Sequence, residues 1–208
     1  MIDIKTTGHI FNISMRKENI REKILQSGST LIYRNGYNGT GIKQITDAAG
    51  IPKGSFYNYF KSKEAFVISA LDYMGQKSLK RMKSSLSDES RRPLERIIGF
   101  FAGMIEKNTH EHKFKQGCFL GNISQEMADV NATIGRKIDY IFKNFTAALS
   151  RCLREAQSRG DIRSDCDIDQ LAEFIFNSWE GALIRMKASR NARPLAAFMD
   201  ILAGVLLK

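Results

Sequence analysis

The chain of 208 residues has few cysteines and histidines, three of each, and no long hydrophobic run. Cys118, Cys152 and Cys166 are odd in number and lack short paired spacing, which argues against a disulfide framework and fits a reducing compartment. No run of about eighteen apolar residues predicts a membrane span, and the N-terminus lacks the apolar core of a signal peptide. These absences predict a cytoplasmic protein with no membrane partner.

Motifs of catalysis are also missing. Gly36 and Gly41 have the spacing of a phosphate-binding loop, but Ile42 occupies the position of the required lysine. A metal site formed by His110, His112 and Cys118 would need three unlike ligands from one flexible loop, so we expect no metal and no cofactor. The enzymatic alternative that stays open is a cysteine-dependent hydrolase in which Cys118 pairs with His110. We otherwise expect no catalytic residues.

Positive charge is concentrated near the N-terminus. The whole chain carries a formal net charge of +10, and residues 1–83 contain 14 Lys and Arg against 6 Asp and Glu. Residues 84–208 are nearly balanced, with 18 basic and 16 acidic residues. Such a surplus suits contact with a phosphate backbone. By itself it is equally compatible with a protein that is simply basic.

The segment from Ile42 to Phe66 predicts a helix, a tight turn and a second helix. Gly50 can adopt the left-handed conformation that ends a helix, and Pro52 suits the first turn of the next one. Phe56 and Phe60 are four residues apart and share one face of that second helix. Its other face carries polar and aromatic side chains, as a helix that enters the major groove requires.

This segment resembles the DNA-binding domain of the TetR/AcrR family of transcriptional repressors. The residues that carry the resemblance are Gly36-Tyr37, Thr40, Ile45, Ala48-Ala49-Gly50, Lys53-Gly54-Ser55-Phe56-Tyr57, Tyr59-Phe60 and Ser62-Lys63-Glu64. Beyond these roughly fifty residues, the chain is similar to the family in length and helical layout. The resemblance implies a homodimer that binds a palindromic operator in double-stranded DNA and responds to a small effector.

The pattern of apolar residues predicts an all-α fold of about nine helices, with no candidate strand. We expect a flexible tail over residues 1–15, with Met15 as an alternative translation start, and a three-helix helix-turn-helix domain over 16–61. A connecting helix should span 62–83. Residues 84–208 should form a helical bundle that binds the effector and dimerises.

The expected DNA contacts combine phosphate binding with base recognition. We expect Thr40, which is also a plausible helix N-cap, to bind phosphate together with Tyr57 and Lys63. Lys53 and the Gly54 amide should lie near the backbone. Ser55, Asn58 and Tyr59 should face base edges.

Two long helices, predicted over residues 131–158 and 167–188, carry wide apolar stripes. In the family such a pair meets its twin to form a four-helix dimer interface, although part of each stripe is explained by the internal core. The resemblance also implies a partly apolar effector pocket. Candidate lining residues are Phe101, Met104, Cys118, Asn122, Met127, Phe145 and Trp179, and each of them can instead be a core residue.

Cys118 supports a second hypothesis about the input signal. It lies at a predicted helix N-terminus, where the helix dipole favours a thiolate, and His112, Lys113 and Lys115 should act in the same direction. The same repressor could then sense oxidants or electrophiles through this thiol, as some family members with a similar segment do. The alternative is that Cys118 is a small buried apolar residue.

Overall fold

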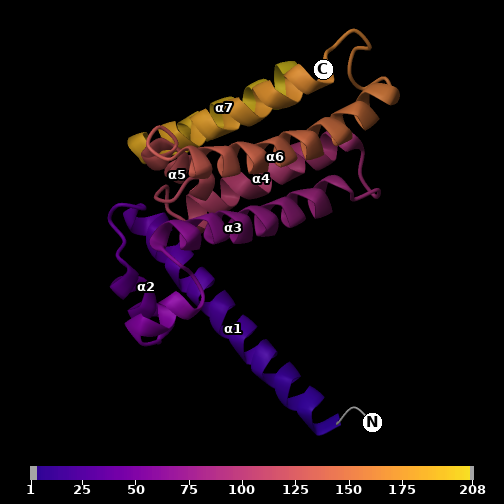
Figure 1. The fold of residues 1–208 in the computed structure, drawn as a ribbon. Helices are drawn as coiled ribbons and strands as arrows, with labels where there is room; N and C mark the ends of the chain where they lie inside the picture. Colours follow the sequence, from indigo (N-terminus) through magenta and orange to yellow (C-terminus); the bar gives the residue numbers. More distant parts are fainter. Residues whose placement is uncertain (1–3, 207–208) are drawn as a thin grey trace. The chain divides into compact units, whose positions relative to one another are not determined.

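The computed structural model describes the backbone of residues 4–206 and the side chains of residues 17–204, and every regular element in this range is helical (Figure 1). The elements are α1 (Ile4–Asn35), α2 (Ile42–Ala49), η1 (Lys53–Asn58), α3 (Lys63–Leu86), α4 (Pro93–Glu106), η2 (Lys107–Glu111), α5 (Phe119–Met127), α6 (Ala132–Ser158), α7 (Ile168–Ser189), α8 (Arg193–Ile201) and η3 (Leu202–Leu206). The π-helical segments η2 and η3 directly continue α4 and α8. Counted in this way, the described chain has nine helices, and the predicted all-α fold is confirmed.

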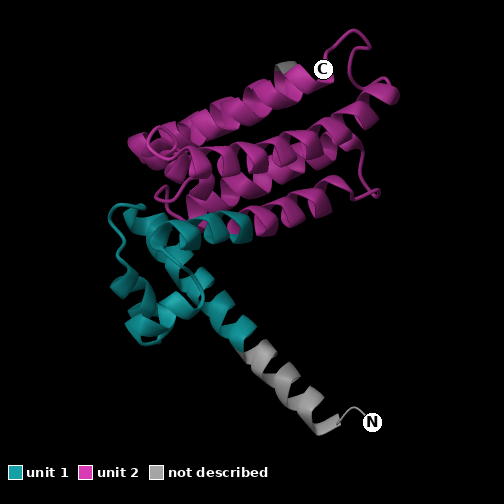
Figure 2. Ribbon diagram, viewed as in Figure 1, with its two compact units in different colours: residues 1–73 teal, residues 74–208 magenta. Residues whose placement is uncertain are grey.

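The chain divides into two compact units, residues 1–73 and 74–208 (Figure 2). The boundary falls within α3, so this helix contributes to both units, as expected of a connecting helix. Ser62 caps its start, because the Ser62 hydroxyl accepts a hydrogen bond from the Ala65 amide at 3.0 Å. In the part of the chain that the structure describes, no helix has both the length and the apolar character needed to cross a membrane.

Three predicted elements differ from the structure. α1 begins at Ile4, so the expected flexible tail is helical over residues 4–15, while residues 1–3 lie outside the described range. Apolar periodicity could not indicate this extension, because it marks only helices with an apolar face. The predicted recognition helix is a short 3₁₀ helix, η1, and the flexible loop expected around His110 and His112 begins as η2, which continues α4.

The first unit is built on an aromatic core. Phe56 of η1 is fully buried, and its ring centroid lies 5.5 Å from that of Phe60 and 5.9 Å from that of Phe66. The rings of Phe60 and Phe66 pack edge to face at 5.1 Å. Burial of a large aromatic side chain contributes several kcal/mol of stability, so this cluster fixes η1 on the unit.

The second unit is a bundle in which α6 and α7 run side by side (Figure 1). Phe176 of α7 packs against Phe142 and Phe145 of α6, with ring centroids 5.3 and 5.8 Å apart. A second aromatic cluster joins three helices: Phe101 lies 5.3 Å from Trp179 and 5.0 Å from Phe198. The two long amphipathic helices are therefore held together by their buried stripes.

Candidate functional site

The turn before η1 has the predicted geometry. α2 ends at Ala49, and Gly50 adopts the left-handed conformation with φ 63° and ψ 40°. The Ile51 amide donates to the Thr46 carbonyl at 3.0 Å, which closes the turn. Because the buried Phe56 anchors η1 from one side, the opposite side of this short helix faces outward.

Most of the predicted DNA-binding residues lie on that outward side. Lys53, Gly54 and Asn58 are exposed, and the Tyr57 side chain is 53% exposed. Ser55 and Tyr59 are partly exposed. A Cβ atom added to Gly54 would meet no heavy atom within 4 Å, so the backbone there is open to close approach. The structure thus brings together donors that suit phosphate and base edges.

Lys63 and Thr40 are more constrained. The Lys63 ammonium lies 4.1 Å above the Tyr37 ring, in a cation–π contact that orients it. Thr40 is fully buried, and its hydroxyl donates to the Gly36 carbonyl at 2.8 Å. A hydroxyl has one hydrogen to donate and a phosphate contact would require it, so the geometry favours a structural role for Thr40. Thr40 is also not the N-cap of α2, a position that Gly41 occupies.

The seven residues predicted to line an effector pocket all belong to the second unit. Phe101, Met127, Phe145 and Trp179 are buried, and Met104 is partly buried. Phe101, Phe145 and Trp179 take part in the aromatic contacts of the core. Cys118 and Asn122 line a small depression of about 10 Å³, together with Glu180 and Lys187 of α7.

The Cys118 thiol is the N-cap of α5. Its sulfur accepts a hydrogen bond from the Gly121 amide at 3.4 Å, and the Glu180 carboxyl is hydrogen-bonded to the thiol. A Cβ atom on Gly121 would come within 2.6 Å of Glu180 Oε2, so a larger residue there would displace the Glu180 carboxyl group. The thiol and a carboxyl group from distant parts of the sequence are therefore held together.

This environment corrects the expected acidity of Cys118. Burial raises the pKa of the Cys118 thiol well above its usual range, and the nearby Glu180 carboxyl raises it further. The Gly121 amide acts in the opposite direction but is outweighed. Burial likewise raises the pKa of Glu180 to about 7. The expected thiolate is therefore not favoured in this conformation, since burial outweighs the helix dipole.

In the described part of the chain, the Cys118 thiol interacts with the Glu180 carboxyl group and with the Gly121 and Leu120 amides, whereas the hydrolase alternative requires the His110 imidazole there. Asn122 is engaged on both sides of its amide. Its nitrogen donates to the Gln116 carbonyl at 3.0 Å, and its oxygen accepts from the Lys187 ammonium at 2.7 Å.

The sequence pointed to Cys118 and Asn122 but missed Glu180 and Lys187. Both lie on α7, which carries several other charged residues, so no local pattern singled them out.

Comparison with known proteins places both units in one family. The model described as "Bacterial regulatory proteins, tetR family" matches residues 24–70, and the model described as "Tetracyclin repressor-like, C-terminal domain" matches residues 93–202. The chain therefore belongs to the TetR family of transcriptional regulators, and it carries the helix-turn-helix DNA-binding domain of that family.

Individual relatives support this membership along nearly the whole chain. The chain is 35% identical to the HTH-type transcriptional repressor DhaR of Mycobacterium sp. (strain GP1), over 93% of this chain and 95% of DhaR. It is 27% identical to the repressor NemR of Escherichia coli K12, over 84% and 87% of the two chains. A regulatory protein TetR from Rhodobacter sphaeroides superposes with a TM-score of 0.81 at 30% identity, covering 87% and 95% of the two chains. The reduced form of E. coli NemR also gives 0.81, at 25% identity and with 89% and 96% covered.

Proposed function

We propose that this protein is a homodimeric repressor that binds a palindromic operator and is released by a small, partly apolar effector. The observation that carries the proposal is η1, with Phe56 buried beneath it and Lys53, Tyr57 and Asn58 exposed on it. The relative DhaR, named as a repressor, is similar along nearly its full length. Such a protein acts in the cytoplasm, on the DNA of the nucleoid.

The exposed surface of the second unit supports the dimer. Phe174 and Ile184 of α7 are 55% and 46% exposed, and Tyr140 of α6 is 62% exposed. Gly181 lies between Phe174 and Ile184 at helical spacing, is exposed, and has no heavy atom within 4 Å of an added Cβ. A glycine flanked by apolar side chains allows another helix to approach closely. We therefore assign the dimer interface to α6 and α7, and a dimer reads two half-sites about 34 Å or more apart.

Ile184→Glu tests the dimer, because it places a charge on the proposed interface. We expect a monomer in sedimentation equilibrium and a large loss of operator affinity, since one η1 contacts few bases. Val130→Glu is the matched control: Val130 is 76% exposed and lies outside α6 and α7. If Ile184→Glu and Val130→Glu both remain dimeric and bind the operator with equal affinity, the assigned interface is contradicted.

The operator itself is tested by selection of genomic fragments with the purified protein, at near-physiological salt and with reductant. Enrichment of a palindrome supports the repressor, and the adjacent genes indicate the class of effector. Fragments bound without any common sequence would contradict operator recognition. The expected loss of affinity on adding effector is 1–3 kcal/mol, or about 5–150-fold, the usual range of allosteric coupling.

The effector position stays a prediction. We propose that it binds among the helices of the second unit, in contact with some of the seven predicted residues, Phe101, Met104, Cys118, Asn122, Met127, Phe145 and Trp179. Alanine substitution of Met104, which is partly buried, provides a first test. It should change the effector concentration needed for release and leave operator affinity without effector unchanged.

A second candidate input is covalent modification of Cys118. The observation that favours it is that a similar protein of known structure, NemR, was obtained in a form described as reduced. The raised pKa of the Cys118 thiol beside Glu180 acts against it in the present conformation. Cys118→Ser should abolish release from the operator by an oxidant. An unchanged response would exclude this input, and Cys152→Ser, at a buried cysteine of α6, is the matched control.

A further inference from the structure

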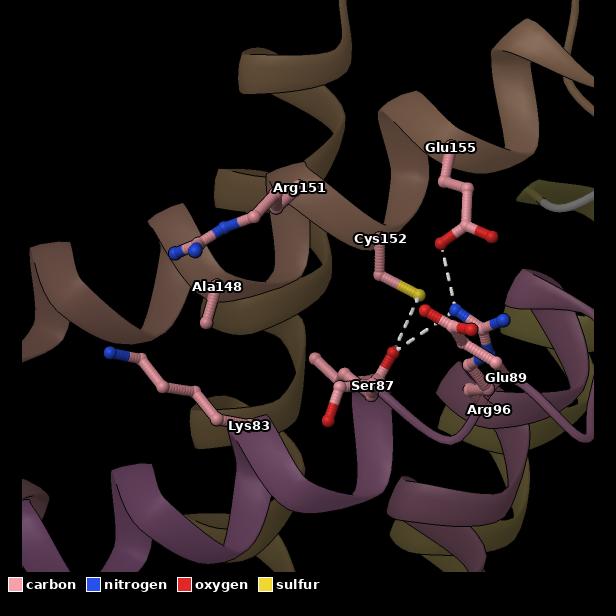
Figure 3. Close-up of a pocket in the computed structure, with 9 residues that line it drawn as sticks. Lys83, Ser87, Glu89, Arg96, Ala148, Arg151, Cys152 and Glu155 are labelled. Atoms are coloured by element: carbon pink, nitrogen blue, oxygen red, sulfur yellow. Dashed lines mark hydrogen bonds and ion pairs between the residues drawn. The ribbon is translucent and has the colours of Figure 1, made fainter.

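A second depression in the bundle lies away from Cys118, where the end of α3 and the start of α4 pack against α6 (Figure 3). Its volume is about 250 Å³. Leu86, Ala148 and Cys152 are buried and form its apolar wall. Burial raises the pKa of the Cys152 thiol to about 11, so this wall is uncharged at neutral pH.

A buried guanidinium group borders the pocket. Arg96 is 3% exposed, and its Nη1 donates to Glu155 Oε2 at 2.7 Å and to the Leu86 carbonyl at 3.4 Å. Its Nε donates to the Arg91 carbonyl at 2.9 Å. Nη2, however, is buried without a hydrogen-bond partner among the residues that the structure describes. A buried donor without a partner is energetically unfavourable, so this group favours an additional acceptor.

Two further cations, Lys83 and Arg151, line the pocket. Lys83 of α3 and Arg151 of α6 point to the same side of Ala148 in Figure 3, and no ion pair of either is present among residues 17–204. The pocket lining also contains two acidic residues, Glu89 and Glu155. Glu155 is already paired with Arg96 and, at 3.4 Å, with Arg159, whereas Glu89 is exposed. The lining therefore carries three cations and two carboxylates.

We propose that this pocket binds a small organic carboxylate. The carboxylate group lies between Lys83 and Arg151, and the apolar part of the ligand lies against Leu86, Ala148 and Cys152. A pocket of about 250 Å³ is below the usual range of roughly 300–1,000 Å³ for drug-sized ligands, so a short aliphatic or aromatic acid fits it best.

Binding at this position would act on the end of the connecting helix. The Leu86 carbonyl, at the C-terminus of α3, accepts a hydrogen bond from Arg96 Nη1. An anion that draws Lys83 toward Arg151 therefore acts within one turn of this anchored end. A role of the pocket in releasing DNA rests on the proposed function, whereas the binding site itself does not.

Titration calorimetry without DNA tests the site, with sodium hexanoate and sodium benzoate as probes and hexanol as the uncharged analogue. We expect saturable binding of at least one acid at millimolar concentrations, weaker binding of hexanol, and loss of affinity as salt is added. Lys83→Gln and Arg151→Gln should each weaken binding about two- to fivefold, as expected for exposed ion pairs. Both residues are exposed, so these variants should fold normally.

The matched controls are Lys80→Gln on α3 and Arg136→Gln on α6, which remove exposed charges on the same helices outside the pocket. Arg151→Lys should restore most of the affinity that Arg151→Gln loses. Equal affinity of the wild-type protein and the Lys83→Gln/Arg151→Gln double variant would overturn the proposal, as would the absence of saturable binding by both acids. Because no DNA is present, either result is independent of the operator proposal.

Discussion

The raised pKa of Glu180 predicts how the free energy of unfolding changes with pH, and the pKa shift sets the size of that change. Burial raises its pKa from the ordinary value of 4.5 to about 7, while the hydrogen bond to the Cys118 thiol slightly offsets this. Between these two pH values the folded protein binds a proton that the unfolded chain does not. The contribution of Glu180 to the free energy of unfolding is therefore fully present below pH 4.5 and is lost as the pH rises through 7. The difference between the two pKa values, 4.5 and about 7, corresponds to about 3 kcal/mol of stability.

Glu180→Gln removes the titration and retains the shape of the side chain. Its free energy of unfolding, relative to the wild type, should increase by about 3 kcal/mol between pH 4.5 and pH 8, because only the wild type loses stability over that interval. Urea unfolding can be followed through Trp179, the single tryptophan, which is 4% exposed and directly precedes Glu180 in α7. Its fluorescence reports on the unit that contains the substitution.

Glu173→Gln, at an exposed carboxyl group of the same helix, is the matched control and should show little change of this kind. If the free energies of unfolding of Glu180→Gln and the wild type differ by the same amount at every pH, the assigned environment of Glu180 is refuted. So would a difference that grows toward low pH, which would mean that the folded protein holds Glu180 as a stabilised carboxylate.

Three further predictions concern the first unit. Gly50→Ala should destabilise it by about 1–2 kcal/mol in urea unfolding, because Gly50 has φ 63°; an unchanged free energy would contradict the left-handed turn. Phe56→Ala should cost about 3–5 kcal/mol, whereas the exposed neighbour Tyr57→Ala should change stability by less than about 0.5 kcal/mol and weaken binding to all DNA sequences. Equal stability losses at the two positions would refute the assigned orientation of η1. Asn58→Ala should relax specificity at one or two operator positions in a binding-site selection, and equal losses on operator and random DNA would contradict base recognition by Asn58.

The helices and their limits were largely predictable, because they depend on local chemistry. Gly36 has φ 79° just after α1, Pro93 begins α4, and Asp167 caps α7 through hydrogen bonds from the Asp169 and Gln170 amides. The spacing of Phe56 and Phe60 indicated that both are buried, although only Phe56 lies within η1. The helical residues before position 16 were missed, since no apolar stripe marks them.

By itself, the sequence determined the all-α fold, most helix boundaries, the turn at Gly50 and membership of a DNA-binding family, because each rests on residues close together in the chain. Only the tertiary structure decided the chemistry of the buried polar groups. Cys118 meets Glu180, and Arg96 meets Glu155, across intervals that no local pattern spans. A pKa depends on burial and on the charges that surround a group in space. A position at a helix N-terminus therefore favoured a thiolate at Cys118 as one of two alternatives, and burial beside Glu180 acts in the opposite direction.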